Sequence, residues 1–186
     1  MNFDHNPTTP LESVKFLGIL VDNHLTFIDH VENSVKKCNS KLLLMRQLRK
    51  VVMNQIGLKT FYCTNIRSIL TYASSVFYNF LSKTCKWRLE HVQASATKII
   101  DPDLEYHERL KVFDLPTLSD FINTASESVF KKISRNEKHP LFNRILINQA
   151  RVTSCLNTVY HPPKCRTQKR FNSFFPSYMS KFNQPF

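Results

Sequence analysis

The chain has 186 residues and a formal net charge of +12, and 42% of its residues are hydrophobic. This length and composition are those of one globular domain with or without a tail, and the excess of cations predicts a polyanionic partner. Gly18 and Gly57 are the only glycines. Rossmann and P-loop nucleotide sites are therefore excluded, because a phosphate-binding loop needs several glycines close together.

The cysteines and the apolar runs indicate the compartment. The five cysteines are scattered singly and none forms a CxxC pair, as is typical of proteins in a reducing compartment. No apolar run reaches the ~18 residues of a membrane span, and the first residues do not resemble a signal peptide. We predict no membrane partner and a cytoplasmic or nuclear location.

The N-terminal part of the chain predicts a leader and a small β-hairpin. Residues 1–13 contain prolines and threonines without periodicity, which predicts a disordered leader. Residues 14–21 are apolar and rich in β-branched side chains, so they predict a strand. Asp22 and Asn23 predict a turn, after which residues 25–27 return as a second short strand. The predicted hairpin covers residues 14–28.

The first predicted helix covers residues 30–50, with Asp29 as its N-cap. Apolar side chains recur along it at spacings of three and four and form a stripe to be buried. The stripe comprises Val31, Val35, Cys38, Leu42 and Met45. Only Glu32 opposes the cations of this helix, so they are candidates for nucleic-acid contacts, although an ordinary solvated face is the alternative. These cations are Lys36, Lys37, Lys41, Arg46, Arg49 and Lys50.

The second predicted helix, at residues 55–80, is the central helix of the core and has Asn54 as its N-cap. Its broad apolar stripe comprises Leu58, Phe61, Tyr62, Ile66, Ile69, Leu70, Ala73, Val76, Phe77 and Phe80. We expect Ile69, Leu70, Ala73 and Phe77 to be buried, and Lys36, Lys37 and Arg49 to be exposed.

Three further helices are predicted at residues 84–100, 105–113 and 118–135. Asp101-Pro102-Asp103 ends the first of these, because proline cannot continue a helix and disfavours helical geometry in the residue before it. The last helix has Phe121, Ile122, Ala125, Val129, Phe130 and Ile133 on one face. The predicted fold is mostly α, with residues 29–136 forming a helical bundle after the hairpin.

Residues 137–186 predict an irregular basic aromatic tail. No Asp or Glu occurs after Glu137, and no helical or strand periodicity is sustained beyond about residue 150. The tail cations that we select as nucleic-acid contacts are Lys164, Arg166, Lys169 and Arg170. Its phenylalanines can either stack on bases or anchor the tail on the helices, and the sequence does not separate these alternatives.

Several motifs, taken in order, resemble the region after the polymerase core of non-LTR retrotransposon reverse transcriptases of the jockey and chicken-repeat type. Residues 14–22, VKFLGILVD, resemble the family pattern K-[FY]-L-G-[VI]-x-[LIV]-D. Residues 44–50, LMRQLRK, are similar to its L-x-R-x-L-R-K. Further similar segments are the LTF at 25–27 and HV at 30–31, 61–78 around IRSILTYA, EHVQ and ATKII within 90–100, LPTL at 115–118, and 166–176 around RTQKRF and SFFP.

This resemblance implies a nucleic-acid-binding fragment without catalytic activity. Phe16, Leu17 and Gly18 would form the hairpin at the end of the palm that grips the primer, and the helices over 30–100 would form the thumb. The implied partners are RNA or an RNA–DNA duplex, and an upstream polymerase domain if a longer chain exists. The family's catalytic aspartates lie upstream of this region, and this chain has no adjacent Asp-Asp pair. We therefore predict that it is not an enzyme.

Two other functions remain open at this point. One is a helical remnant or interaction domain with no nucleic-acid role. The other is a domain of an AlkB-type tRNA-modifying dioxygenase, because the same region is similar to the domain described as the N-terminal part of an AlkB homologue. Such an enzyme holds Fe(II) with an H-x-D…H triad, and no histidine here is followed two places on by Asp.

Metal sites and cofactors are not expected. Asp101 and Asp103 are the nearest to a carboxylate pair, but a loop that ends a helix explains them better. Cys155, His161 and Cys165 have a faint zinc-like spacing, whereas a closed zinc site needs four ligands. We predict no metal and no cofactor.

Overall fold

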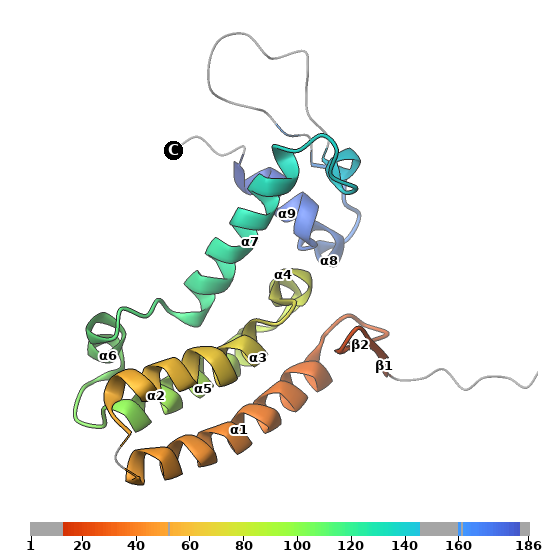
Figure 1. The fold of residues 1–186 in the computed structure, drawn as a ribbon. Helices are drawn as coiled ribbons and strands as arrows, with labels where there is room; N and C mark the ends of the chain where they lie inside the picture. The colour runs from red at the N-terminus through yellow and green to blue at the C-terminus, as the bar shows by residue number, and fades with distance from the viewer. Residues whose placement is uncertain (1–12, 52, 146–159, 161, 183–186) are drawn as a thin grey trace, which may run out of the picture.

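The computed structural model describes residues 13–51, 53–145, 160 and 162–182, and over these residues it is mostly helical with a two-stranded N-terminal hairpin (Figure 1). The predicted fold class is confirmed. The predicted leader lies outside the described residues except for Ser13, with which the first strand begins. Across the described residues, no helix combines the length and the apolar character that a membrane span requires.

The hairpin consists of β1 (Ser13–Phe16) and β2 (Ile19–Asp22), which pair antiparallel. The single strand predicted over 14–21 is wrong, because this segment folds back on itself. The chain turns at Leu17 and Gly18, whose φ angles are 45° and 85°. A two-residue hairpin turn of this kind needs positive φ at both positions, and a leucine gives no signal of it in the sequence.

Residues 25–27 do not form the predicted second strand. Instead, the carboxylate of Asp22 organises them as a loop: it accepts hydrogen bonds from the backbone N–H groups of His24 at 2.8 Å, Thr26 at 2.9 Å and Phe27 at 2.7 Å. The Thr26 hydroxyl donates a further bond at 2.8 Å. Asp22 thus ties the hairpin to the chain that leads into the first helix.

Helix α1 (Ile28–Lys50) follows Phe27, whose φ is 56°, and no side chain caps it. The prediction of Asp29 as N-cap is wrong, although its charge in the first helical turn still favours the helix dipole. The predicted buried stripe is present: Val31, Cys38, Leu42 and Met45 are each at most 3% exposed, and Val35 is half-buried.

The helix predicted over 55–80 is divided into several pieces. These are α2 (Gln55–Phe61), the π-helix η1 (Tyr62–Arg67), α3 (Ser68–Thr71), α4 (Ser74–Phe77) and the 3₁₀-helix η2 (Tyr78–Phe80). Asn54 caps α2 as predicted, because its side chain accepts the Gly57 N–H at 2.8 Å. The main break is at Tyr72 and Ala73, where Ala73 has a φ of 51°.

The break changes which side chains of this segment are buried. Leu70 and Phe77 are buried as predicted, but Ile69 and Ala73 are only half-buried. Val76, which the helical spacing placed in the stripe, is 55% exposed. A chain that turns at Ala73 no longer continues the helical register, which explains why Val76 is exposed, although Phe77 stays buried.

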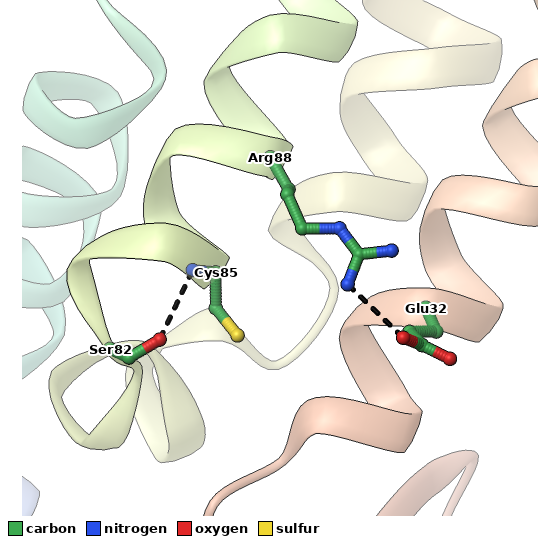
Figure 2. Close-up of polar contacts among 4 residues, drawn as sticks. All are labelled: Glu32, Ser82, Cys85 and Arg88. Carbon is green, nitrogen blue, oxygen red and sulfur yellow. Dashed lines mark hydrogen bonds and ion pairs between the residues drawn. The ribbon is translucent and has the colours of Figure 1, made fainter.

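Helix α5 (Lys83–Ile100) begins at the Ser82 cap and lies parallel beside α1 (Figures 1 and 2). Near the beginning of both helices, Arg88 of α5 forms an ion pair with Glu32 of α1 at 3.1 Å. The main hydrophobic core lies between α1, α5 and the divided central segment. The predicted start of α5 differs from the observed one by a single residue.

Helices α6 (Tyr106–Val112) and α7 (Leu118–Ser134) form where they were predicted. The first half of α7 adds Leu118 and Ile122 to the main core, whereas Phe130 belongs to a second hydrophobic cluster. Two residues assigned to the buried face of α7, Ala125 and Val129, are exposed. The buried positions over this stretch are instead Ser126, Phe130 and Ile133.

The C-terminal region is more regular than predicted. It contains the 3₁₀-helix η3 (Phe142–Arg144) and the helices α8 (Gln168–Phe171) and α9 (Phe174–Phe182). Helix α9 packs on α7, where the Phe182 ring stacks on Phe130 with centroids 5.3 Å apart. Packing on an existing helix stabilises helices too short to form alone, which explains why periodicity did not reveal them.

Candidate nucleic-acid interface

All six cations predicted on α1 are exposed, but the structure divides them between different faces of the helix. Lys37 faces α3, where it lines a pocket with Tyr72. Arg46 and Arg49 face α5, where they line another pocket with Lys98. Lys36 lies opposite the buried stripe by helical spacing. Among the described residues, no carboxylate is within ion-pairing distance of any of these cations.

The pocket between the ends of α1 and α5 has a volume of about 600 Å³, and we call it the α1–α5 pocket. It is lined by Arg46, Arg49, Lys50, Ser95, Lys98, Ile99 and Pro102. None of the described residues that line it is acidic. Asp101 is close in sequence, but its carboxylate accepts hydrogen bonds from the Gln55 side chain at 3.4 Å and the Asp103 backbone N–H at 3.1 Å.

Parallel packing of α1 and α5 explains why the cations gather there. The two helices pack side by side through the core, with the partly exposed Glu32–Arg88 pair near their beginnings (Figure 2). Residues from both ends line the same pocket. Arg49 and Lys50 lie in the last turn of α1, and Lys98 lies in the last turn of α5. Cations at a helix end are stabilised by the partial negative charge of the helix dipole.

A second pocket, of about 400 Å³, lies between the hairpin, α1 and α3, and we call it the hairpin pocket. It is lined by Gly18, His30, Ser34, Lys37, Ser68, Ile69 and Tyr72. The Tyr72 hydroxyl donates a hydrogen bond to the Leu17 carbonyl at 2.9 Å. A Cβ at Gly18 would lie 3.4 Å from the Tyr72 ring, and φ there is positive. Both constraints favour glycine.

His30 forms the inner wall of the hairpin pocket and is only 5% exposed. Its Nδ1 accepts the Leu20 backbone N–H at 3.5 Å, and its ring contacts Phe77 edge-on at 4.7 Å. Burial, and then the charge of Lys37, lower the pKa of His30 below its ordinary value. His30 therefore serves as a neutral packing residue that holds β2 on α1.

The hairpin residues assigned to the primer grip are at the surface. Phe16 is 65% exposed and Leu17 is 75% exposed, and Gly18 is exposed beside Tyr72. Their side chains and backbone are thus accessible to another molecule. Of these three residues, only Gly18 contributes to the hairpin pocket.

The tail cations Lys164, Arg166, Lys169 and Arg170 are all exposed. The structure does not bring them to the α1–α5 pocket. The Lys169 ammonium donates to the His24 carbonyl at 2.5 Å, beside the hairpin and at the opposite end of α1 (Figure 1). The neighbouring phenylalanines differ in burial. Phe171 is 39% exposed, whereas Phe174 and Phe175 pack against the second hydrophobic cluster. The structure thus favours anchoring over base stacking for these two.

Residues of the EHVQ and LPTL segments contact one another inside the molecule. The Gln93 amide donates to the Pro116 carbonyl at 2.9 Å, and its oxygen accepts the Tyr62 hydroxyl at 2.5 Å. The Glu90 carboxylate accepts the Leu118 backbone N–H at 3.1 Å. Glu90 also accepts the hydroxyl of Tyr106. These polar residues connect η1, α5, α6 and α7, so their role is to hold the fold together.

Metal-ligating groups do not gather in the described part of the chain, where no three His, Cys, Asp or Glu side chains are placed to hold an ion. Asp101 and Asp103 belong to the loop after α5. Cys155 and His161, two members of the zinc-like spacing, lie outside the described residues.

Lys98 and Ser95 are the polar residues of the α1–α5 pocket that sequence reasoning missed. They belong to α5, and their meeting with the α1 cations depends on the parallel packing of the two helices. The motif ATKII contains Lys98 and marks it as part of a helix, but nothing in the motif indicates which neighbour it faces.

No family model, curated protein or solved structure matches the chain. The resemblance to reverse transcriptases therefore stays a prediction from the motifs alone.

Proposed function

We propose that this chain is a non-catalytic fragment of a retroelement reverse transcriptase that binds RNA or an RNA–DNA duplex through the phosphate backbone. The observation that supports this most strongly is the set of exposed cations along α1, which have no carboxylate partner among the described residues. Lys98 of α5 extends this set at one end. Solubility alone does not require unpaired cations that gather around a pocket.

The dimensions of α1 suit a duplex. Its 23 residues correspond to a length of about 35 Å at a rise of about 1.5 Å per residue, long enough to pass several successive phosphates of a strand, which lie about 3.4 Å apart along the axis in B-form DNA. Lys36 and Lys37 lie near the middle of α1 and Lys50 lies at its end, so the cations extend over about 21 Å of the helix. Contacts between these cations and phosphates follow the backbone and carry no base sequence information.

The hairpin extends the proposed surface beyond α1. Gly18 lets the backbone at the hairpin tip lie close to a neighbour, and Lys37 is the cation of the hairpin pocket. In the proposed function this pocket receives the backbone near the primer end, as the resemblance implies for Phe16, Leu17 and Gly18.

A salt titration of duplex binding tests the proposal. Each lost phosphate contact lowers the slope of log affinity against log salt by about one unit. We expect Arg46→Gln/Arg49→Gln/Lys50→Gln to reduce the slope for an RNA–DNA duplex, equally for different base sequences. A control with Lys131→Gln/Lys132→Gln removes charge from the last turn of α7 and should retain the slope. Equal slopes for all three proteins would contradict the proposal.

An interaction domain is the second candidate, because α1 also exposes apolar side chains. Leu43 is 59% exposed and Leu44 is 41% exposed, and exposed apolar groups of this kind occur at protein interfaces. Binding through these leucines would bury apolar surface and depend weakly on salt. The same titration therefore separates the two candidates.

A further inference from the structure

The α1–α5 pocket combines features that a flat cationic surface lacks. Arg46, Arg49, Lys50 and Lys98 converge on one hollow of about 600 Å³, a size within the range of small-ligand sites. Ser95 supplies a hydroxyl at the same place, and Ile99 and Pro102 supply apolar wall. A pocket with both charged and apolar walls suits a compact anionic ligand that displaces water from it.

Neutralisation of the helix ends does not account for all this charge. Each helix C-terminus behaves as about half a negative charge, so the ends of α1 and α5 together require about one cation. Four cations line the pocket. Asp101 lowers the local excess only in part, because Gln55 and the Asp103 backbone already engage its carboxylate. More positive charge remains than one backbone phosphodiester, with its single charge, can offset.

We infer that the α1–α5 pocket binds a phosphate group that carries two or more negative charges, either at the phosphorylated end of a nucleic-acid strand or in free diphosphate. A phosphate monoester carries nearly two charges at neutral pH. The planar guanidinium groups of Arg46 and Arg49 suit paired oxygens, and Lys98 supplies a point charge. If the ligand is the phosphorylated end of a nucleic-acid strand, the inference rests on the proposed function.

The test compares an RNA–DNA duplex that ends in a 5′-phosphate with the same duplex ending in a 5′-hydroxyl. The wild type should prefer the phosphorylated end by at least about tenfold, as expected for one charge-assisted hydrogen bond. Arg49→Gln/Lys98→Gln should remove this preference. Lys36→Gln/Lys37→Gln removes the same charge from α1 outside the pocket, so it should weaken both duplexes equally and keep the preference.

Diphosphate binding, measured by calorimetry, provides the second arm. If diphosphate binds the wild type but not Arg49→Gln/Lys98→Gln, the inference is supported. If the wild type also binds the 5′-phosphate and 5′-hydroxyl duplexes equally, the ligand of the pocket is the free anion. The inference is overturned if the wild type shows neither an end preference nor diphosphate binding. Duplex binding without either effect leaves the proposed function standing, whereas absence of duplex binding refutes that function separately.

Discussion

Asp22 is the residue on which the connection between hairpin and bundle depends most directly. Partial burial raises its pKa, but hydrogen bonds from Thr26, Phe27 and His24 outweigh burial and hold the pKa below the ordinary value of 3.8. A carboxyl whose pKa is lowered by folding stabilises the fold above its unfolded pKa, and this contribution is lost as the pH falls through the folded value. Its charged form is therefore the stabilising one.

We expect Asp22→Asn to lower the free energy of unfolding by about 1–2 kcal/mol at neutral pH, within the range for a hydrogen-bond donor that loses its acceptor. The amide nitrogen that replaces Oδ2 cannot accept the bonds from the Phe27 N–H and the Thr26 hydroxyl. Denaturation of both proteins between neutral and strongly acidic pH measures this. The difference should begin to shrink below about pH 4, where the carboxyl of the unfolded protein becomes protonated, and should be lost below the lower pKa of the folded protein; a difference independent of pH would refute this role.

Phe77 is a second residue whose burial can be tested. It is 2% exposed and its ring lies 5.9 Å from that of Phe27. Phe77→Ala should destabilise the protein by about 3–5 kcal/mol, because it leaves a cavity in the core. Phe16→Ala, at a position that is 65% exposed, should change stability by less than about 0.5 kcal/mol. A thermal melt of Phe77→Ala that coincides with the wild type would count against the bundle.

At the scale of elements, Gln93 of α5 connects to η1 through Tyr62, to α6 through Tyr106, whose hydroxyl accepts its amide N–H at 3.1 Å, and to the loop before α7 through Pro116. Gln93→Met keeps a similar volume but leaves the Tyr62 hydroxyl and the Pro116 carbonyl without this partner. We expect a loss of about 2–4 kcal/mol in the free energy of unfolding, because buried polar groups without hydrogen bonds are costly. Gln47→Met, at an exposed position of α1, is the matched control. Equal chemical denaturation midpoints for the two variants would show that the network does not stabilise the fold.

The elements differ in how well the sequence predicts them. The bounds of α5, α6 and α7 could be predicted because capping residues and proline mark their ends locally. The turn at Leu17 and the break at Ala73 were not, because both residues adopt positive φ without being glycine. The Tyr72–Leu17 hydrogen bond joins residues 55 positions apart, and such tertiary contacts leave no periodic signal.

The candidate interface shows the same division. Exposure of Lys36 and Lys37 followed from the apolar stripe of α1, which leaves the other faces to solvent. Arg49 continues the register of the stripe and is exposed in the last turn of the helix. Lys98 could not be assigned to the interface, because its position depends on α5 lying parallel to α1. Helix periodicity specifies the face of one helix and does not specify its neighbour.

At the scale of the whole molecule, we predict that the purified chain does not extend a primer. The chain has no adjacent Asp-Asp pair, and two-metal phosphoryl transfer needs carboxylates that converge on the ions. Incubation with template, primer, nucleotides and Mg²⁺ should leave the primer unextended, with an active polymerase as the positive control. Template-dependent extension by the chain alone would refute the prediction.

The central claim is that α1 follows a duplex backbone, and the most direct test compares duplex with single-stranded RNA in a salt titration of three proteins. These are the wild type, Arg46→Gln/Arg49→Gln/Lys50→Gln, and a tail variant with Lys164, Arg166, Lys169 and Arg170 each changed to Gln. The account predicts that the α1 variant loses salt slope mainly on the duplex, by about one unit for each phosphate contact removed. It predicts that the tail variant loses more on single strands, where exposed Phe171 lies beside the cations. Equal slopes for all three proteins on both ligands would contradict the account.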